Sequence, residues 1–418
     1  ILAHLMGGER GLDQLIDAVG LSKNAVVNHL SQLVEGGLVH RPARGRYALT
    51  LDGADLMNAV ARMFRDSTSR SKAERERLGL LYANMRKGEI RMRDKLVTRR
   101  AEYQCSWLSF LGATAGVLTA MGKACDTVET GGSSGYAFLL NLRKEFLCPS
   151  GPTAIHDRTF KEMLDGIGDL GAAIRYYGEE GGVPTGDRMG EMDLIRARSF
   201  FEVVSHGIDD TDLPAVVWGI PIPEWGIVNG YEGDAYIVST IRNEGRPEPP
   251  FHYSELNAPG CLSALFFRLG EVRPNDRTSL ERGMRMGMGK IEVAPGYVAG
   301  TKAYDLWADL LHTSDDSGYF GHSYMTQCWA SARGLAGAYL ERLSERQVGS
   351  RRRLLKEASQ AYAEEALLLT ELGRLFPFSF KGEMDEPKRV RGATLIMEAK
   401  GKDEDALVRI KEALSLFK

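Results

Sequence analysis

Apolar residues recur every three or four positions in two consecutive stretches near the start of the chain. The first stripe comprises Leu12, Leu15, Ile16 and Val19, and the second comprises Val26, Leu30 and Leu33. This spacing predicts two amphipathic helices. Gly20 turns the chain between them, Ser22 is placed to cap the second helix, and Gly36 and Gly37 end it.

The second predicted helix carries a polar face opposite its apolar stripe. The candidate contact residues at its start and along this face are Ser22, Lys23, Asn24, Asn28 and His29. Amide side chains can pair with adenine edges in a DNA major groove, and lysine can contact guanine or phosphate. The pattern therefore predicts a helix that reads double-stranded DNA.

Two short stretches that favour strands follow, at 38–40 and 47–51. The turn between them, at 41–46, contains Pro and Gly and carries Arg41, Arg44 and Arg46. A hairpin with cationic side chains is suited to contact phosphate or the minor groove. We expect these three arginines to contribute to DNA binding.

This order of helix, turn, helix and basic hairpin resembles the winged helix-turn-helix transcriptional regulators, over about residues 1–65. The resemblance implies a DNA-binding domain and, because such regulators commonly have two-fold symmetry, a homodimer. A winged helix that contacts only proteins is the alternative. Acidic and basic residues are nearly balanced here, so DNA affinity would depend on local placement of the arginines.

Basic side chains outnumber acidic ones over residues 66–100. This stretch is interpreted as a linker helix that adds phosphate contacts or forms a dimer seam. A solvated charged face is the alternative.

Composition limits the class of protein. The 418 residues are 43% hydrophobic and 26% charged, with a formal net charge of −3, which predicts a globular chain that is not disordered. The helices and strands predicted along the chain give an α+β fold class. No apolar run is long enough to span a membrane and no secretory leader is evident, so we expect a cytoplasmic protein without membrane contact. The five cysteines lack a C-x-x-C spacing, which argues against zinc and disulfides. No metal or cofactor is expected.

Cys105 directly precedes an apolar stretch, 106–121, which contains small residues at Gly112, Ala113, Ala115 and Gly116. The pattern predicts a tightly packed helix with the thiol at its N-terminus, where the helix dipole would lower the thiol pKa. A helical segment ending near 212 follows, and then residues 213–240 read as strand, loop, strand, tight turn and strand.

The order of these motifs resembles a papain-like domain, the N-terminal family of butirosin biosynthesis protein H, related to bacteriocin-processing cysteine peptidases. The resemblance covers about residues 101–270. It implies a nucleophilic cysteine, a histidine at the start of a strand and an acid or amide that orients it. Here Glu224 and Trp225 occupy the histidine region, and Ser239 or Thr240 occupies the orienting position, so we expect no peptidase activity.

A papain-like cleft without a catalytic base can still bind a ligand. The residues that we expect to line it are Cys105, Trp107, Glu224, Trp225 and Tyr231. Tyr304 and Trp307 share a face of a helix predicted within 290–311 and are expected to form a second wall of the site. For all these aromatic residues, packing in a hydrophobic core is the alternative.

The chain after residue 323 is predicted to be helical, with a Pro-punctuated break from Pro377 to Pro387 and a last helix over 403–417. The expected domains are a winged helix (1–65), a linker helix (66–100), a papain-like sensor (101–322) and helical additions (323–418). Together they predict a one-component transcriptional regulator that binds a small effector. A Cys105-dependent acyltransferase or amidohydrolase, and a thiol redox sensor, are the alternatives.

Overall fold

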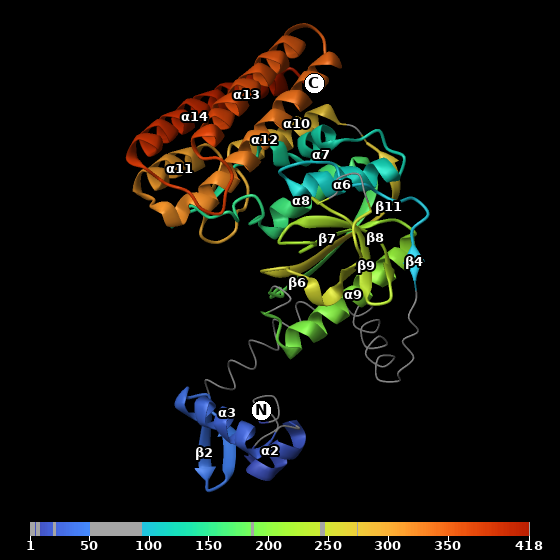
Figure 1. Cartoon of the computed structure of the whole chain (residues 1–418), viewed down its shortest axis with the longest axis vertical. Helices are drawn as coiled ribbons and strands as arrows, with labels where there is room; N and C mark the ends of the chain where they lie inside the picture. Colours follow the sequence, from blue (N-terminus) through green and yellow to red (C-terminus); the bar gives the residue numbers. More distant parts are fainter. Residues whose placement is uncertain are drawn as a thin grey trace. The chain divides into compact units, whose positions relative to one another are not determined.

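The computed structural model describes residues 5, 9–19, 22–50, 94–184, 188–242, 247–273 and 275–417. The chain divides into two compact units, Ile1–Arg91 and Met92–Lys418 (Figure 1). Both contain helices and antiparallel sheets. Most of the predicted linker helix, residues 66–93, lies outside the described residues.

The first unit consists of two helices and a small sheet. Its elements are β1 (Arg10–Gly11), α2 (Leu12–Val19), α3 (Lys23–Glu35), β2 (Val39–Ala43) and β3 (Arg46–Leu49). The strands form an antiparallel sheet in the order β1-β3-β2. The apolar stripes of the two helices meet in one core, to which Leu15, Val26, Leu30 and Tyr47 contribute. The helices and hairpin predicted from the apolar spacing are therefore present.

The second unit contains a larger antiparallel sheet. Its strands are β4 (Lys95–Leu96), β6 (Leu170–Glu180), β7 (Ala215–Trp218), β8 (Trp225–Glu232), β9 (Ala235–Ser239), β10 (Phe251–His252) and β11 (Cys261–Val272). Their order is β10-β9-β8-β7-β11-β6, and β4 pairs with β8. The strands predicted within 213–240 are confirmed as β7, β8 and β9. Residues 94–100, assigned from the sequence to a linker helix, instead contain β4.

Two cores lie on opposite faces of this sheet, because side chains alternate along each strand. The helices beside it are α6 (Ser109–Ala120), α7 (Thr127–Ser134), α8 (Asp157–Gly168) and α9 (Glu191–Thr211). On β11, Leu265 and Phe267 belong to the core that includes α6, whereas Ala264 and Phe266 belong to the core that includes α9. Figure 1 shows α6 and α9 on opposite sides of the sheet.

The segment 101–105 crosses α6 at very short range. A Cβ at Gly112 would lie 2.3 Å from the carbonyl oxygen of Gln104, and one at Gly116 would lie 2.2 Å from that of Glu102. Asn229 of β8 holds the same segment by accepting from Ala101 N at 2.8 Å and donating to its carbonyl oxygen at 2.9 Å. The small residues of α6 thus permit the close packing predicted for it.

The C-terminal helices pack side by side and share a core with the sheet (Figure 1). The remaining elements are η1 (Tyr136–Phe138), β5 (Asn141–Arg143), η3 (Tyr253–Glu255), α10 (Asp276–Gly287), β12 (Tyr297–Ala299), α11 (Thr301–Thr313), η4 (Asp316–Gly318), α12 (Tyr319–Glu345), α13 (Gly349–Leu375) and α14 (Glu386–Ser415). One continuous apolar core runs from α6 through α12 to α14. The predicted boundary at 322/323 therefore does not separate two compact units.

The last helix begins much earlier than predicted. Asp385 caps α14 by accepting from Lys388 N at 2.9 Å, and Pro387 lies in the first turn. Proline is tolerated there because the first N–H groups of a helix have no partner within the helix. Pro387 thus starts this helix, whereas the sequence-based expectation placed it in a break.

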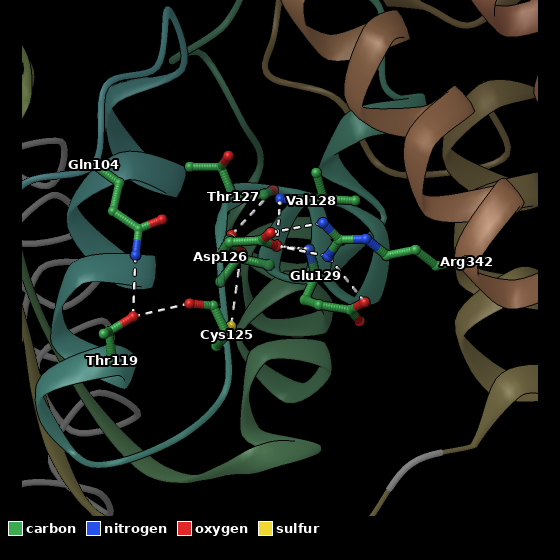
Figure 2. A network of polar contacts seen from close by, with 9 residues as sticks. Gln104, Thr119, Cys125, Asp126, Thr127, Val128, Glu129 and Arg342 are labelled. Carbon is green, nitrogen blue, oxygen red and sulfur yellow. Dashed lines mark hydrogen bonds and ion pairs between the residues drawn. The ribbon is translucent and has the colours of Figure 1, made fainter.

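A polar network joins the segment before α6 to the C-terminal helices (Figure 2). Gln104 Nε2 donates to Thr119 Oγ1 at 3.0 Å, and Thr119 Oγ1 donates to the carbonyl oxygen of Cys125 at 2.8 Å. The next residue, Asp126, caps α7 and accepts two hydrogen bonds, of 2.7 and 2.9 Å, from Arg342 of α12. These hydrogen bonds link the segment before α6 to α6 itself, then to the start of α7 and on to α12.

Candidate functional site

Two regions contain the residues singled out from the sequence: α3 with its hairpin in the first unit, and the sheet face beside α6 in the second. In the first unit, Ser22 is the N-cap of α3, with a 3.4 Å hydrogen bond from Ala25 N to its Oγ. Val26 and Leu30 are fully buried. The predicted contact residues Lys23, Asn24, Asn28 and His29 are all exposed. Helix α3 therefore presents donors and acceptors on a face that its own core does not use.

The three arginines of the hairpin have different surroundings. The Arg41 guanidinium lies over the ring of Tyr47, 5.1 Å from its centroid, and Arg46 forms an ion pair with Glu9. Arg44 lies in the exposed turn beside Gly45, which has a φ of +72°. Among the described residues, Arg44 has no ion-pair or hydrogen-bond partner. It is therefore the arginine of the three best placed to contact a phosphate.

Cys105 does not occupy the N-terminus of α6. The thiol is exposed and lies in a segment without regular secondary structure, whereas Leu108 is the N-cap and Ser109 is the first helical residue. The field of a helix dipole decreases within the first turn, so the expected activation of this thiol by the dipole loses its geometric basis. Ser109, rather than Cys105, lies at the start of this helix.

Ser109, Glu224 and Tyr324 form a closed hydrogen-bonded group. Ser109 Oγ donates to Glu224 Oε2 and accepts from Trp225 N at 3.1 Å. Tyr324 of α12 donates to Glu224 Oε1 at 2.5 Å. Both carboxylate oxygens of Glu224 thus have donors from within the protein, and a bound ligand is not required as the partner of this carboxylate.

Burial dominates the electrostatics of this group. It raises the pKa of Glu224, although the hydrogen bonds from Ser109 and Tyr324 oppose the change. Burial also raises the pKa values of Tyr324 and Cys328. Burial thus makes the charged form of Glu224 less favourable than it is in water, and the two hydrogen bonds offset part of this effect.

A cavity of about 210 Å³ lies next to this group. Its walls come from α6, η1, the loop before α8, α8 itself, β6, β8 and β11, on the α6 side of the sheet. The lining residues are Phe110, Tyr136, Pro152, Thr153, Ile155, Asp157, Phe160, Tyr176, Gly178, Glu179, Glu180, Trp225, Cys261 and Ser263. Glu224 and Ser109 do not line it, although their neighbours Trp225 and Phe110 do.

Four aromatic rings that pack against one another form one wall of the cavity, called its floor below: Phe110, Phe160, Tyr176 and Trp225. Trp225 stacks on Phe160 with ring centroids 6.0 Å apart and packs edge-on against Phe110 at 5.6 Å. Phe160 in turn packs edge-on against Tyr176, at 5.3 Å. The Tyr176 hydroxyl lies 3.2 Å from Ser263 Oγ. Trp225 is thus the member of the predicted ligand set that reaches the cavity.

Two other members of that set lie elsewhere. Trp107 is 40% exposed and packs edge-on against Tyr324 and Phe378, with centroids 6.4 and 5.2 Å away. Tyr231 belongs to the core on the α9 face, and its hydroxyl donates to Asp209 at 2.9 Å. Strict alternation along β8 would place residues 225 and 231 on the same face of the sheet. The bulge between Val228 and Gly230 shifts the register by one residue, so Tyr231 lies on the α9 face and does not share the cavity with Trp225.

Tyr304 and Trp307 lie in the hydrophobic core rather than in a second wall of the cavity. Trp307 is fully buried and donates through Nε1 to His322 Nδ1 at 3.0 Å. Tyr304 donates to Glu365 and accepts from the buried Arg333, whose Nη2 lies 3.0 Å away. Their polar atoms are paired within the protein, so the packing alternative describes both residues.

Sequence reasoning missed Phe160, Tyr176, Asp157 and Glu180. They belong to α8 and to the edge strand β6, which pairs with β11 from far along the chain. The available signal was the run of aromatic and acidic residues over 176–180. Its position beside Trp225 follows only from the tertiary structure.

No family model matches the chain, and no curated protein matches it either. Among the described residues, no helix is long and apolar enough to cross a membrane.

Proposed function

We propose that the chain is a transcriptional regulator, which binds DNA through a winged helix in its first unit and a small effector in the cavity of its second unit. The exposed polar face of α3, opposite the buried Val26 and Leu30, is the observation that carries the DNA-binding part. A helix of this kind followed by a hairpin with an unpaired cation fits the major groove and the adjacent phosphates.

The effector-binding part rests on the relation of α6 to β8. In active papain-like domains, the nucleophile at the start of a helix meets a histidine at the start of a strand. Here the corresponding pair is Ser109 and Glu224, which bond to each other. This supports a papain-like domain that has lost its catalytic pair and retains a ligand cavity.

A cysteine acyltransferase or a redox sensor at Cys105 receives less support. Among the described residues, no histidine and no second cysteine is hydrogen-bonded to this thiol. Catalysis requires a base within hydrogen-bond reach, and a sensor commonly has a resolving thiol nearby.

The proposed mechanism is a shift between two arrangements of a homodimer. An effector that binds one arrangement more tightly increases its population and thereby changes affinity for an operator. Two-fold symmetry would place a pair of recognition helices on half-sites about one helical turn apart.

Selection from a random library of DNA duplexes tests this proposal. The 418-residue chain, mixed with the library at moderate salt, should enrich one sequence with two related half-sites. A protein with Asn24 and Asn28 both changed to Ala should lose that enrichment, whereas the control change Lys411→Ala, at an exposed residue of the second unit, should not. Recovery of random sequence by the unmodified protein would overturn the proposal.

A further inference from the structure

We infer that the cavity of the second unit binds a small organic amine, with its apolar body on the aromatic floor and its cationic group at an acidic rim. This inference rests on the proposed effector-binding function and adds the chemical class of the effector. It follows from the distribution of rings and charges around the cavity.

The floor provides ring faces and edges for an apolar or cationic group. Phe110 and Tyr136 are almost completely buried, Phe160 and Trp225 are partly buried, and Tyr176 is 41% exposed. Neighbouring rings among Phe110, Phe160, Tyr176 and Trp225 lie between 5.3 and 6.0 Å apart. Rings in such an arrangement attract an ammonium group within about 6 Å of a ring centroid.

The rim carries three acidic side chains, one of which is paired with a cation. Asp157, Glu179 and Glu180 line the cavity, while no Lys, Arg or His is among its described lining residues. Arg196 neutralises Glu179 through hydrogen bonds of 2.9 and 3.1 Å. In the described part of the chain, the side-chain carboxylates of Asp157 and Glu180 have no hydrogen-bond or ion-pair partner.

The carboxylate of Asp157 and the ring of Tyr176 both line the cavity. Asp157 lies in the same helix as Phe160, whose ring packs edge-on against Tyr176 with centroids 5.3 Å apart. Burial raises the pKa of Tyr176, the contact with Ser263 opposes the change, and Cys261 and Asp157 contribute smaller increases. An ammonium group over the exposed part of Tyr176 would thus contact a ring and lie near an unpaired carboxylate. An anionic ligand would meet repulsion at the same place, because two free carboxylates face it.

The volume restricts the body of the ligand. A cavity of about 210 Å³ is smaller than the range of about 300–1,000 Å³ typical of drug-sized ligands. A single aromatic or short aliphatic group fits this limit better than a polycyclic or oligomeric ligand.

Binding to four probes that share one phenyl ring and differ in charge tests the inference. The full chain is titrated with phenethylamine, benzyltrimethylammonium, 2-phenylethanol and phenylacetate, and the tryptophan fluorescence and the heat of binding are followed. We expect both cations to bind about tenfold more tightly than the alcohol, because cation–ring attraction adds to apolar contact, and phenylacetate to bind weakest. Equal binding of alcohol and amines, or binding of no cation, would overturn the inference.

Variants locate the binding. Tyr176→Leu and Asp157→Asn change exposed side chains, and each should weaken phenethylamine binding about three- to tenfold. Glu345→Gln, at an exposed residue at the end of α12 that does not line the cavity, is the matched control and should bind as the unmodified chain does. Unchanged amine affinity in both cavity variants would place the amine elsewhere and contradict the inference.

The regulator proposal can fail independently. If amines bind at this cavity but the chain selects no DNA sequence, the amine site stands and the regulator function falls. If the chain selects an operator but none of the cations binds, the amine inference falls and the regulator function stands.

Discussion

Ser109, the first residue of α6, donates a hydrogen bond to the carboxylate of Glu224, which immediately precedes β8. The pair brings the start of a helix and the start of a strand together, as a nucleophile and its base would. Tyr324 and Trp225 N occupy the remaining positions around it. Because these hydrogen bonds are all made within the protein, they hold α6, β8 and α12 together where the three elements meet.

Glu224→Gln should change the pH dependence of stability. Burial raises the pKa of Glu224, so the native state binds its proton more tightly than the unfolded state does. The free energy of unfolding contributed by this residue therefore falls as pH rises above the unfolded pKa of about 4.3. Relative to the unmodified chain, Glu224→Gln should become more stable with increasing pH. Urea unfolding followed by tryptophan fluorescence measures this, since all tryptophans lie in the second unit. A difference that stays constant with pH would contradict the raised pKa.

Cys105 should not support turnover of peptides or activated esters. The thiol is exposed but lies outside α6, and in the described residues no histidine bonds to it. Cys105→Ser should leave any background hydrolysis unchanged, because loss of an acting nucleophile would reduce the rate by several orders of magnitude. Mass spectrometry after incubation with an activated ester gives an independent readout. A Cys105-linked acyl group that forms and then hydrolyses would restore the enzyme alternative.

His322 should make the second unit sensitive to mild acid. Burial lowers the pKa of His322 to about 3, and its Nδ1 accepts from Trp307 Nε1. An unfolded histidine has a pKa of about 6.5, so the unfolded state binds more protons between these values and stability falls as pH drops through this window. His322 contributes up to about 1.4 kcal/mol per pH unit to the slope of the unfolding free energy against pH.

The matched variant is His322→Gln, which keeps an acceptor for Trp307. Its unfolding free energy, measured between pH 4 and pH 7, should lack this part of the slope. A variant that loses stability with acid as steeply as the unmodified chain would show that His322 titrates normally.

Two glycines in helices should respond oppositely to alanine. A Cβ at Gly116 would lie 2.2 Å from the Glu102 carbonyl oxygen, so Gly116→Ala must displace the segment 101–105 and should cost about 1–3 kcal/mol. Gly334, in α12, is exposed with nothing within 4 Å of an added Cβ. Gly334→Ala should therefore stabilise the second unit by about 0.5–1 kcal/mol. Equal effects in urea melts would contradict the close crossing of α6.

Local patterns explain what the sequence predicts correctly. The apolar spacing of α2 and α3, and the short apolar runs with turns between them at 213–240, depend on neighbouring residues, so these elements can be predicted directly. The same reasoning fails at α14, where Pro387 lies at a helix start rather than in a break. It also misplaces the start of α6, because Leu108 caps this helix without a side-chain hydrogen bond and so leaves no sequence signal.

The candidate site depends on long-range pairing and is predicted only in part. Trp225 is found from the sequence because it follows Glu224 in a strand with a recognisable pattern. Tyr176 and Asp157 are not, because β6 reaches the site by pairing with β11 and α8 reaches it by packing beside β6. Trp307 is predicted from the sequence to line the site but lies in the core. Two aromatic residues on one face of a helix give the same sequence pattern in a core as in the wall of a ligand site.

The decisive measurement for DNA binding by α3 and its hairpin is DNA affinity as a function of salt. It is made on Arg44→Ala and Asn28→Ala with the duplex that the protein selects. Arg44 is unpaired in the described structure and should contact phosphate, so its removal should weaken all duplexes alike and reduce the salt slope by about one. Asn28 faces outward from α3, and its removal should lower the preference for the selected duplex over random DNA by about 1–3 kcal/mol while the slope stays unchanged. If neither variant alters affinity, slope or preference relative to Lys411→Ala, the first unit does not bind DNA through this face and the account is contradicted.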